Sequence, residues 1–376
     1  MRYGIIGTGM MGHEHIRNIA LLPDAEIADL ADPDPTMLES ASVLARELGH
    51  APRLHAHHHD LLSRERSLDA VLIVAPNHWH HAIMVDALET RLPILCEKPL
   101  ATTGDDVWDL VHKGEQRTAP VWVAMEYRYM PPIATLIGSA RDGTLGDLHM
   151  LAMREHRFPF LRKVGDWNRH NVRTGGTMVE KCCHFFDLMR LILSSEPSRL
   201  YASGSQAVNH LNEVHADGPA DIVDNGFVTI DFVNGTRAML DLCMFAEGSY
   251  WQEEIVVVGS SSKMEARVPG PPRFWPAGIE REAELVLSPR QEKGPVKVHV
   301  PVDETILRAG DHHGSTFYQH RAFARMVREG GEPDVSLRDG AIAVDMGLAA
   351  ETSIRSGEVV SLGSVRDAAI AATAAQ

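Results

Sequence analysis

The chain has 376 residues, of which 44% are hydrophobic and 23% charged, the balance of an ordinary soluble globular protein. This length exceeds what one hydrophobic core usually holds, so two domains are expected. The 36 Lys+Arg against 51 Asp+Glu give a net charge of −15, which removes the electrostatic basis for a nucleic-acid partner. No apolar run reaches transmembrane length, so no membrane partner is expected.

Cysteine usage indicates the compartment. Cys96, Cys182, Cys183 and Cys243 form neither a disulfide framework nor a Cys-x-x-Cys metal signature, and they fit a reducing environment. The sequence enters a predicted strand at once, without an apolar leader segment. We therefore expect a cytoplasmic protein.

The first 123 residues alternate short apolar segments with helical ones. This pattern predicts a doubly wound parallel sheet with helices on both faces. The predicted strands cover residues 3–6, 26–31, 70–74, 93–96 and 121–125, and predicted helices include 11–22 and 36–48.

From residue 125 onward, apolar and polar residues alternate, which is typical of half-buried strands in an antiparallel or mixed sheet. Asn234-Gly235 predicts a type I′ hairpin turn, in which both residues have positive φ. Residues 176–193 have helical periodicity and predict one helix. The predicted strands here cover 148–157, 200–208, 226–233, 236–245, 254–259 and 283–287, followed by helices over 315–328 and 337–355 and a frayed tail over 364–376.

A glycine turn, Gly7-Thr8-Gly9-Met10-Met11-Gly12, follows the first predicted strand and opens a helix. Glycine at these spacings allows a tight turn, close approach of the backbone to a pyrophosphate and close helix–strand packing. The turn therefore predicts a dinucleotide site. Asp32 ends the second strand, where its carboxylate would accept hydrogen bonds from an adenosine ribose and repel a 2′-phosphate, which indicates NAD. A turn residue ahead of Pro33 is the alternative interpretation of Asp32.

Two further strand ends carry Pro76, Asn77, His80, Glu97 and Lys98. Ligands of an open parallel sheet bind outside the carboxyl ends of its strands, so we expect these five residues near the nicotinamide. Lys98 can relay a proton or, if Glu97 keeps it charged, stabilise an alkoxide. A surface salt bridge between the two is the structural alternative.

The predicted helix 176–193 places Glu180 and His184 four residues apart, hence on one face. Glu180 could then orient His184, which would act as a general base for a hydroxyl proton. A histidine satisfied within the core is the alternative, and the room left by Gly175-Gly176 favours a site. Cys182 and Cys183 beside His184 predict no metal site, because adjacent residues on a helix point in different directions.

Taken together, these residues resemble the Gfo/Idh/MocA family, named for glucose–fructose oxidoreductase, inositol dehydrogenase and the rhizopine-catabolism protein. The resemblance implies an NAD-binding Rossmann domain over residues 1–123 and a substrate-binding and oligomerisation α/β domain over 124–363. The large, open and mainly antiparallel sheet of the second domain often mediates dimers or tetramers. The matching elements are the glycine turn, Pro76-Asn77 with His80, Glu97-Lys98-Pro99, Tyr127-Arg128-Tyr129, Gly175-Gly176 with Glu180, His184 and Asp187, and Gly347-Leu348-Ala349-Ala350.

The resemblance further implies that Lys98 and His184 flank the reacting carbon of a sugar, an inositol or a related cyclic polyol. The family usually has aspartate where this chain has Glu180, which either orients His184 or reaches the substrate itself. Candidate hydrogen-bonding residues for such a substrate are Tyr127, Arg128, His156, Arg157, Trp167, Asn168 and His313.

The expected function is an NAD-dependent dehydrogenase acting on a secondary hydroxyl group, with Lys98, His184 and Glu180 as catalytic residues. One alternative keeps the fold but cleaves glycosides through transient oxidation of a ring carbon. Another is a sensor that binds the dinucleotide without turnover.

Overall fold

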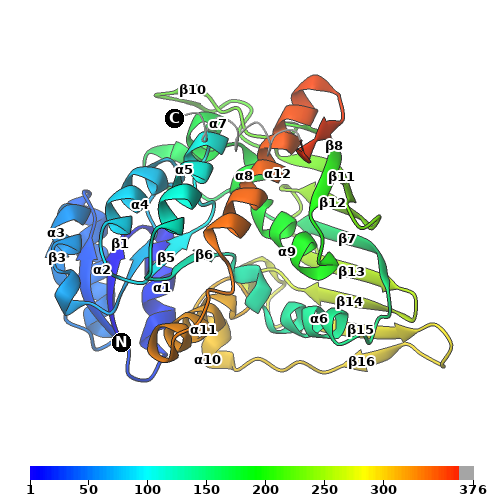
Figure 1. The fold of residues 1–376 in the computed structure, drawn as a ribbon, viewed down its shortest axis with the longest axis horizontal. Coiled ribbons are helices and arrows are strands. Elements are labelled where there is room, and N and C mark those ends of the chain that lie inside the picture. The colour runs from blue at the N-terminus through cyan, green and yellow to red at the C-terminus, as the bar shows by residue number, and fades with distance from the viewer. Residues whose placement is uncertain (364–376) are drawn as a thin grey trace.

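The computed structural model describes residues 1–363, so the predicted tail over 364–376 lies outside the described residues. Two large sheets build the fold (Figure 1). The first has six parallel strands in the order β3-β2-β1-β4-β5-β6. They are β1 (Arg2–Ile6), β2 (Glu26–Ala31), β3 (Arg53–His55), β4 (Ala70–Ile73), β5 (Ile94–Glu97) and β6 (Val121–Ala124).

The central strands of this sheet are apolar on both faces because helices cover both. All residues of β4, β5 and β6 are buried. This confirms the predicted doubly wound parallel sheet, although no strand was predicted at β3, which has three residues and little burial. The helices between the strands are α1 (Met10–Ala20), α2 (Pro35–Glu47), α3 (His58–Leu62), α4 (His80–Leu88) and α5 (Gly104–Glu115).

The second sheet has nine strands in the order β16-β15-β14-β13-β7-β12-β11-β8-β17. Within residues 1–363, β7 and β12 are the only strands of this sheet that pair in parallel, so the sheet is mixed and mainly antiparallel, as predicted. The strands are β7 (Leu148–His156), β8 (Pro197–Ser205), β11 (Asn225–Phe232), β12 (Arg237–Cys243), β13 (Glu253–Gly259), β14 (Ser262–Val268), β15 (Glu284–Pro289), β16 (Val296–Val298) and β17 (Val360–Ser361). A separate two-stranded ribbon joins β9 (Val214–His215) to β10 (Gly218–Pro219).

The hairpin between β11 and β12 forms where predicted, but its turn is of another type. Gly235 has φ of 85°, and Asn234 is not among the residues with positive φ. The Gly235 amide donates to the Phe232 carbonyl at 3.0 Å, and the Phe232 amide donates to the Thr236 carbonyl at 2.9 Å. The type I′ prediction was therefore wrong, because a three-residue loop with one left-handed glycine closes the hairpin.

The single helix predicted over 176–193 was also wrong. Helix α8 (Thr177–Glu180) ends after one turn, and α9 (Cys183–Leu193) starts after Lys181 and Cys182. The Cys182 amide bonds the Thr177 carbonyl, five residues back, at 3.3 Å, so the regular helical register is interrupted between Glu180 and His184. The other helices of this half are α6 (Pro131–Arg141), α7 (Asn171–Thr174), α10 (Glu304–Arg308), α11 (Ser315–Glu329) and α12 (Leu337–Ser356).

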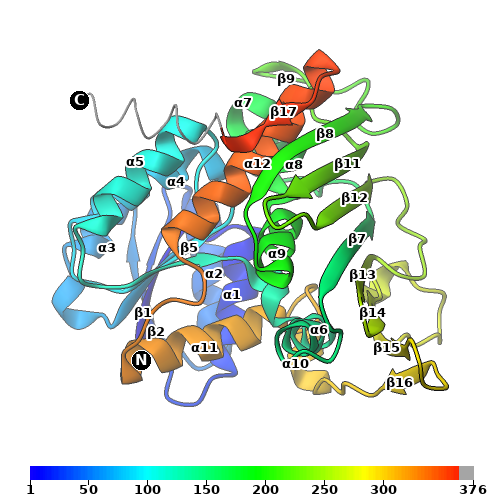
Figure 2. The same cartoon turned by 45° about the vertical axis from the view of Figure 1, so that its right-hand side comes forward.

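Helix α12 lies between the two sheets, where it packs on α5 and β6 of the first and on β8 and α9 of the second (Figure 2). The indole of Trp108 in α5 donates to Asp345 at 2.9 Å, and the Ser353 hydroxyl accepts from the Ala202 amide of β8 at 2.8 Å. Helix α12 therefore connects the two halves of the chain and holds them against each other. Within residues 1–363 we find no helix with the length and apolar character that crossing a bilayer requires.

Candidate active site

A cavity of about 880 Å³ lies at the carboxyl ends of the parallel strands and is lined by residues of both halves of the chain. The glycine turn and Asp32 are at its walls, as are Asn77, Lys98 and His184. The cavity therefore joins the predicted cofactor residues to the predicted catalytic residues.

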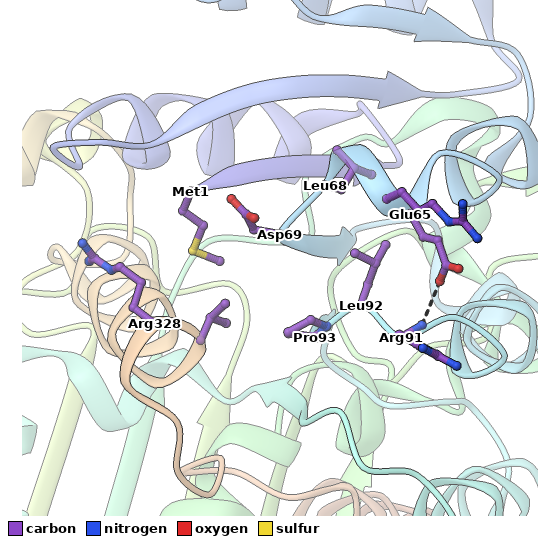
Figure 3. A pocket seen from close by; sticks show the side chains of 10 residues that line it. Met1, Glu65, Leu68, Asp69, Arg91, Leu92, Pro93 and Arg328 are labelled. Atoms are coloured by element: carbon purple, nitrogen blue, oxygen red, sulfur yellow. Dashed lines mark hydrogen bonds between the residues drawn. The ribbon is translucent and has the colours of Figure 1, made fainter.

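A second hollow of about 700 Å³ lies at the amino ends of the same strands (Figure 3). Met1, Asp69 and Pro93 line it just before β1, β4 and β5, and the Arg91 amide bonds Glu65 at 2.9 Å at its rim. None of the predicted site residues lines this hollow, so the site belongs to the first cavity.

The glycine turn has the geometry that a bound dinucleotide requires. A Cβ on Gly7, whose φ is 95°, would lie 2.6 Å from the backbone of Val74 and Ala75, and one on Gly12 would lie 2.6 Å from the Gly7 carbonyl oxygen. Gly9 has open space at its Cβ position and lines the cavity, so a pyrophosphate can approach its backbone and the free N–H groups that begin α1. Met10 and Met11 also face the cavity.

Asp32 faces the cavity directly after β2. Its carboxylate accepts from the Thr8 amide at 2.7 Å, from the Thr8 hydroxyl at 3.0 Å and from the Asp34 amide at 2.9 Å. Thr8 itself is buried behind the turn and does not line the cavity, so its role is to fix Asp32 beside the glycine residues.

The strand end after β4 contributes Pro76, Asn77 and His80 to the cavity wall. His80 is fully buried, and its ring nitrogens lie 2.7 Å from the Pro99 carbonyl and 2.8 Å from the Ala75 carbonyl. Its imidazole therefore joins the chain segments that follow β4 and β5. Asn77 reaches across to the other half of the chain, where its amide donates to Glu180 at 3.0 Å.

Lys98 follows β5, and its ammonium group donates to the Glu180 carbonyl oxygen at 2.9 Å. Burial by itself lowers the pKa of Lys98, but the acidic groups around it, Glu180 and Glu97 among them, outweigh this and raise it above the ordinary value. Glu97 is held by His15 at 3.0 Å and by the Lys98 amide at 3.1 Å. The exposed salt bridge considered for Glu97 and Lys98 is therefore absent from the described residues, and the Lys98–Pro99 bond is cis.

Glu180 does not bond His184 in this structure. Its two carboxylate oxygens accept instead from Lys163 at 3.1 Å and from Asn77 at 3.0 Å. The predicted orientation of His184 by Glu180 fails because the helix is interrupted between them and because two partners from elsewhere in the chain take up the carboxylate.

His184 lines the cavity and is otherwise buried. Its ring stacks on Tyr127, and its Nδ1 atom has no hydrogen-bond partner within residues 1–363. Burial, followed by the positive charges of Lys98 and Lys181, lowers the pKa of His184 well below 6.5. The imidazole is therefore neutral at pH 7 and able to accept a proton.

Of the seven further residues proposed for substrate, Arg157 and Trp167 line the cavity. The other five do not. Four of them bond other side chains or the backbone instead. Tyr127 bonds Glu253 at 3.3 Å and Lys181, Arg128 bonds Asp187 at 2.6 Å, His156 bonds Asp241 at 3.0 Å, and Asn168 bonds the Leu161 carbonyl at 2.9 Å. The Nε2 atom of His313 is buried without a hydrogen-bond partner in the described part of the chain.

Alternation along β7 explains the error at His156. Glu155 is fully buried on the side of the sheet that faces the helices, so His156 projects to the other side and meets Asp241 of β12. His313 was predicted to bind substrate, whereas its neighbour His312, which was not predicted, lines the cavity and bonds Glu14 at 2.7 Å. Lys163 and Lys181 also face the cavity and were missed, since a single lysine in a loop, or in the break between two helices, carries no pattern.

In the described part of the chain, two groups of three side chains of metal-ligand type lie close together, with their ligand atoms within 4.8 Å of one another. They are His58, His59 and Asp86, and Glu14, Glu126 and His312. Both already contain internal hydrogen bonds, 2.8 Å from His58 to Asp86 and 2.7 Å from His312 to Glu14. Neither includes Cys182, Cys183 or His184.

The parallel sheet, this glycine turn and the cavity with half-buried Lys98 and buried His184 together define an oxidoreductase that binds NAD. Comparison with family models makes this specific. Residues 1–125 match the model "Oxidoreductase family, NAD-binding Rossmann fold", and residues 140–362 match "Oxidoreductase family, C-terminal alpha/beta domain". The chain belongs to the Gfo/Idh/MocA oxidoreductase family.

Several relatives match over most of their length. The myo-inositol 2-dehydrogenase of Thermotoga maritima is 25% identical over 368 residues, which are 97% of this chain and 99% of that protein. The rhizopine catabolism protein MocA of Rhizobium meliloti is 27% identical over 277 residues, 73% of this chain and 79% of that protein.

Solved structures show the same fold. A probable dehydrogenase from Thermotoga maritima superposes with a TM-score of 0.76 at 25% identity, covering 97% of this chain and 100% of that one. A levoglucosan dehydrogenase solved with NADH and levoglucosan has a TM-score of 0.80 at 19% identity, covering 96% of this chain and 99% of that one.

Proposed function

We propose that the protein is a dehydrogenase that transfers hydride between a secondary hydroxyl group of a sugar, inositol or related cyclic polyol and NAD. The observation that carries this proposal is a single cavity lined by the glycine turn, Lys98 and His184. Burial and nearby cations lower the pKa of His184, and the acidic groups around Lys98 raise its pKa, which suits a neutral base beside a fixed positive charge. The full-length likeness to a myo-inositol 2-dehydrogenase supports the substrate class.

His184 is the general base in this proposal. NAD, held by the glycine turn and Asp32, would supply the acceptor for the hydride that leaves the hydroxyl-bearing carbon. His184 takes the hydroxyl proton, since burial and nearby positive charge keep its imidazole unprotonated at pH 7. A positioned base of this kind typically contributes a factor of about 10²–10⁴ in rate.

Lys98 supplies charge rather than the proton. Its raised pKa keeps the ammonium group protonated through the neutral range, so it can stabilise negative charge on the reacting oxygen. Glu180 acts on Lys98 and Lys163 rather than on His184: its peptide carbonyl holds the first, and its carboxylate holds the second.

The preference for NAD over NADP rests on Asp32. Its carboxylate is fixed by Thr8 and Asp34 at the adenosine end of the cavity, where a 2′-phosphate would meet a negative charge. Like charges about 4 Å apart repel by up to about 4 kcal/mol at a surface-like dielectric.

A dimer or tetramer through the open face of the nine-stranded sheet is also proposed. The helices α9 and α6 cover one face of this sheet. Large apolar side chains are exposed on the other, namely Met150, Tyr201, Phe227 and Met239, each 41% to 60% exposed. A cytoplasmic location stays a prediction.

The test is a spectrophotometric screen of sugars, inositols and anhydrosugars with NAD and NADP in parallel. We expect NADH formation with at least one cyclic polyol and a clear preference for NAD. His184→Ala and Lys98→Ala should each lower kcat by at least about 100-fold while NAD binding persists. Near-normal turnover in either variant contradicts the assignment, and glycoside cleavage without net NADH would favour the elimination chemistry instead.

A further inference from the structure

Behind the wall of the cavity, the imidazole of His15 lies between His320 and Glu97. His15 is in the second turn of α1, and His320 is in α11, a helix from the other half of the chain that packs on α1. The Nδ1 atom of His15 is 2.8 Å from Nε2 of His320, and its Nε2 atom is 3.0 Å from Glu97. Both histidines are fully buried and neither lines the cavity, whereas Glu97 does. They are therefore placed to act on a bound ligand through Glu97.

The contacts of His15 have a defined direction. An ionised carboxylate can only accept, so Nε2 of His15 carries a hydrogen and donates to Glu97. Burial lowers the pKa of His320 well below 6.5, so its ring is neutral, and its Nδ1 atom is buried without a partner in the described residues. If His15 donated to His320, that Nδ1 atom would hold a hydrogen with no acceptor, so His320 is the donor. Tyr3 meets the His320 ring edge-on, with ring centroids 5.7 Å apart and ring planes 87° apart.

Glu97 is a buried carboxylate whose charge depends on these neighbours. Burial opposes its ionisation, but the hydrogen bond from His15, with Lys98 and His80 nearby, outweighs this and lowers its pKa below the ordinary value. Its second oxygen accepts from the Lys98 amide at 3.1 Å. Both oxygens are therefore held, and the charge stays next to Lys98.

The ammonium group of Lys98 depends on such charges, because its hydrogen bond is to a neutral group, the Glu180 carbonyl at 2.9 Å. The carboxylate of Glu180 is paired with Lys163 at 3.1 Å, and burial raises the pKa of Glu126. Glu97 is thus the carboxylate best placed to keep Lys98 charged. The titratable groups that influence Lys98, or are influenced by it, are Glu97, Glu126, Glu180, Cys183, His80, Lys163, Lys181 and His184.

We infer that His15 is a positioning residue, which holds the carboxylate of Glu97 and through it keeps the Lys98 ammonium charged beside the reacting oxygen. His320 fixes the orientation of His15 that this role requires. The inference deepens the proposed function, on which its kinetic readout rests. Its consequence is that α11, from the second half of the chain, helps to set the charge of a lysine in the first half.

Two variants separate the nitrogen atoms of His15. In His15→Gln the side-chain amide can take the place of Nε2 and still donate to Glu97, whereas in His15→Asn it reaches only the place of Nδ1, next to His320. Trace acetylation with acetic anhydride, followed by mass spectrometry at several pH values, measures the free-amine fraction of Lys98 without turnover.

We expect His15→Asn to lower the pKa of Lys98 by about half to one pH unit, which means about three- to tenfold more acetylation of this residue at pH 9. The alkaline limb of kcat/KM should move to lower pH by the same amount. His15→Gln should restore both properties nearly to those of the unmodified protein.

Glu97→Gln tests the route of the effect and does not depend on the folding of His15→Asn. It removes the charge of Glu97 and should shift Lys98 at least as far as His15→Asn does, and combining the two substitutions should add no further shift. His55→Asn is the matched control, because His55 bonds the buried Asp29 at 2.7 Å and does not line the cavity. This variant should lose stability but leave the acetylation of Lys98 unchanged.

Equal acetylation of Lys98 in His15→Asn and His15→Gln, or no shift in Glu97→Gln, overturns the inference. A further shift when His15→Asn is added to Glu97→Gln also overturns it, since His15 would then act by another route. If acetylation changes as expected but no compound in the wider screen is oxidised, the proposed function fails and the positioning role of His15 stands.

Discussion

The imidazole of His184 lies flat on the phenol ring of Tyr127, with ring centroids 4.2 Å apart and ring planes 5° apart. The far end of Tyr127 is fixed, since its hydroxyl bonds Lys181 and donates to Glu253 at 3.3 Å. Tyr127 was expected to bind substrate. From this geometry we expect Tyr127 instead to position the ring of His184.

Replacing Tyr127 tests this role. Tyr127→Leu removes the flat partner of His184, so kcat should fall by about 10- to 100-fold with little change in NAD affinity. Tyr127→Phe keeps the ring and should recover most of kcat, although the lost hydroxyl leaves Lys181 and Glu253 short of a partner and lowers thermal stability. Equal kcat losses in the two variants would show that the hydroxyl, not the ring, matters.

The pH dependence of substrate oxidation should report on His184. Burial and nearby cations lower its pKa, so the neutral form that accepts a proton persists to well below pH 6.5, and kcat/KM should decline only under more acidic conditions. Lys181→Met removes one of the cations and should move this acidic limb upward by about half to one pH unit. Lys113→Met, on the surface of α5, should leave the limb in place; an unchanged limb in Lys181→Met would contradict the electrostatic account.

His312 should make the stability of the fold fall as the pH rises. Burial opposes the charged form, but Glu126 and Glu14 raise the pKa of His312 to about 9, above the ordinary value of 6.5. Its protonation therefore stabilises the fold fully below about pH 6.5, and this contribution is lost as the pH rises to about 9. His312→Asn should lower the free energy of unfolding in urea by at most about 3 kcal/mol at pH 6 and by much less at pH 9.5. His299→Asn, at an exposed position, is the control, and a pH-independent loss in His312→Asn would exclude this linkage.

Two glycines of the turn, Gly9 and Gly12, should affect different properties when replaced: NAD binding and stability, respectively. Gly9 has open space around its Cβ position, so Gly9→Ala should fold normally but weaken NAD binding at least about tenfold, because the methyl group occupies the approach to the backbone. A Cβ on Gly12 would lie 2.6 Å from the Gly7 carbonyl, so Gly12→Ala should cost about 1–3 kcal/mol of stability. Urea unfolding and fluorescence titration with NADH measure the two effects; strong NAD binding by Gly9→Ala would contradict the turn's assigned role.

Much of the fold was predictable because its signals are local. The apolar strands of the first sheet, the glycine turn after β1 and the alternation along β7 and β11 are each visible within about ten residues. The strand β14 was predictable in the same way, since buried Met264 and Ala266 alternate with charged residues, but no strand was predicted there.

The site was less predictable because its contacts join distant parts of the chain. Lys98 was identified from its place after a strand. The partners of Glu180 come from residues 77 and 163, which no local spacing relates to position 180. Periodicity likewise cannot show that Lys181 and Cys182 interrupt a helix, so the expected contact between Glu180 and His184 was wrong.

Helix α12 has a consequence for how ligands reach the site. It is bonded to α5 through Trp108 and to β8 through Ser353, and a Cβ on its Gly347 would lie 2.6 Å from the Met178 carbonyl of α8. The two sheets cannot swing apart without breaking these contacts, so opening by a hinge between domains is disfavoured. We therefore expect ligands to enter and leave past residues 157–169, several of which line the cavity, and turnover to depend on how readily this segment moves.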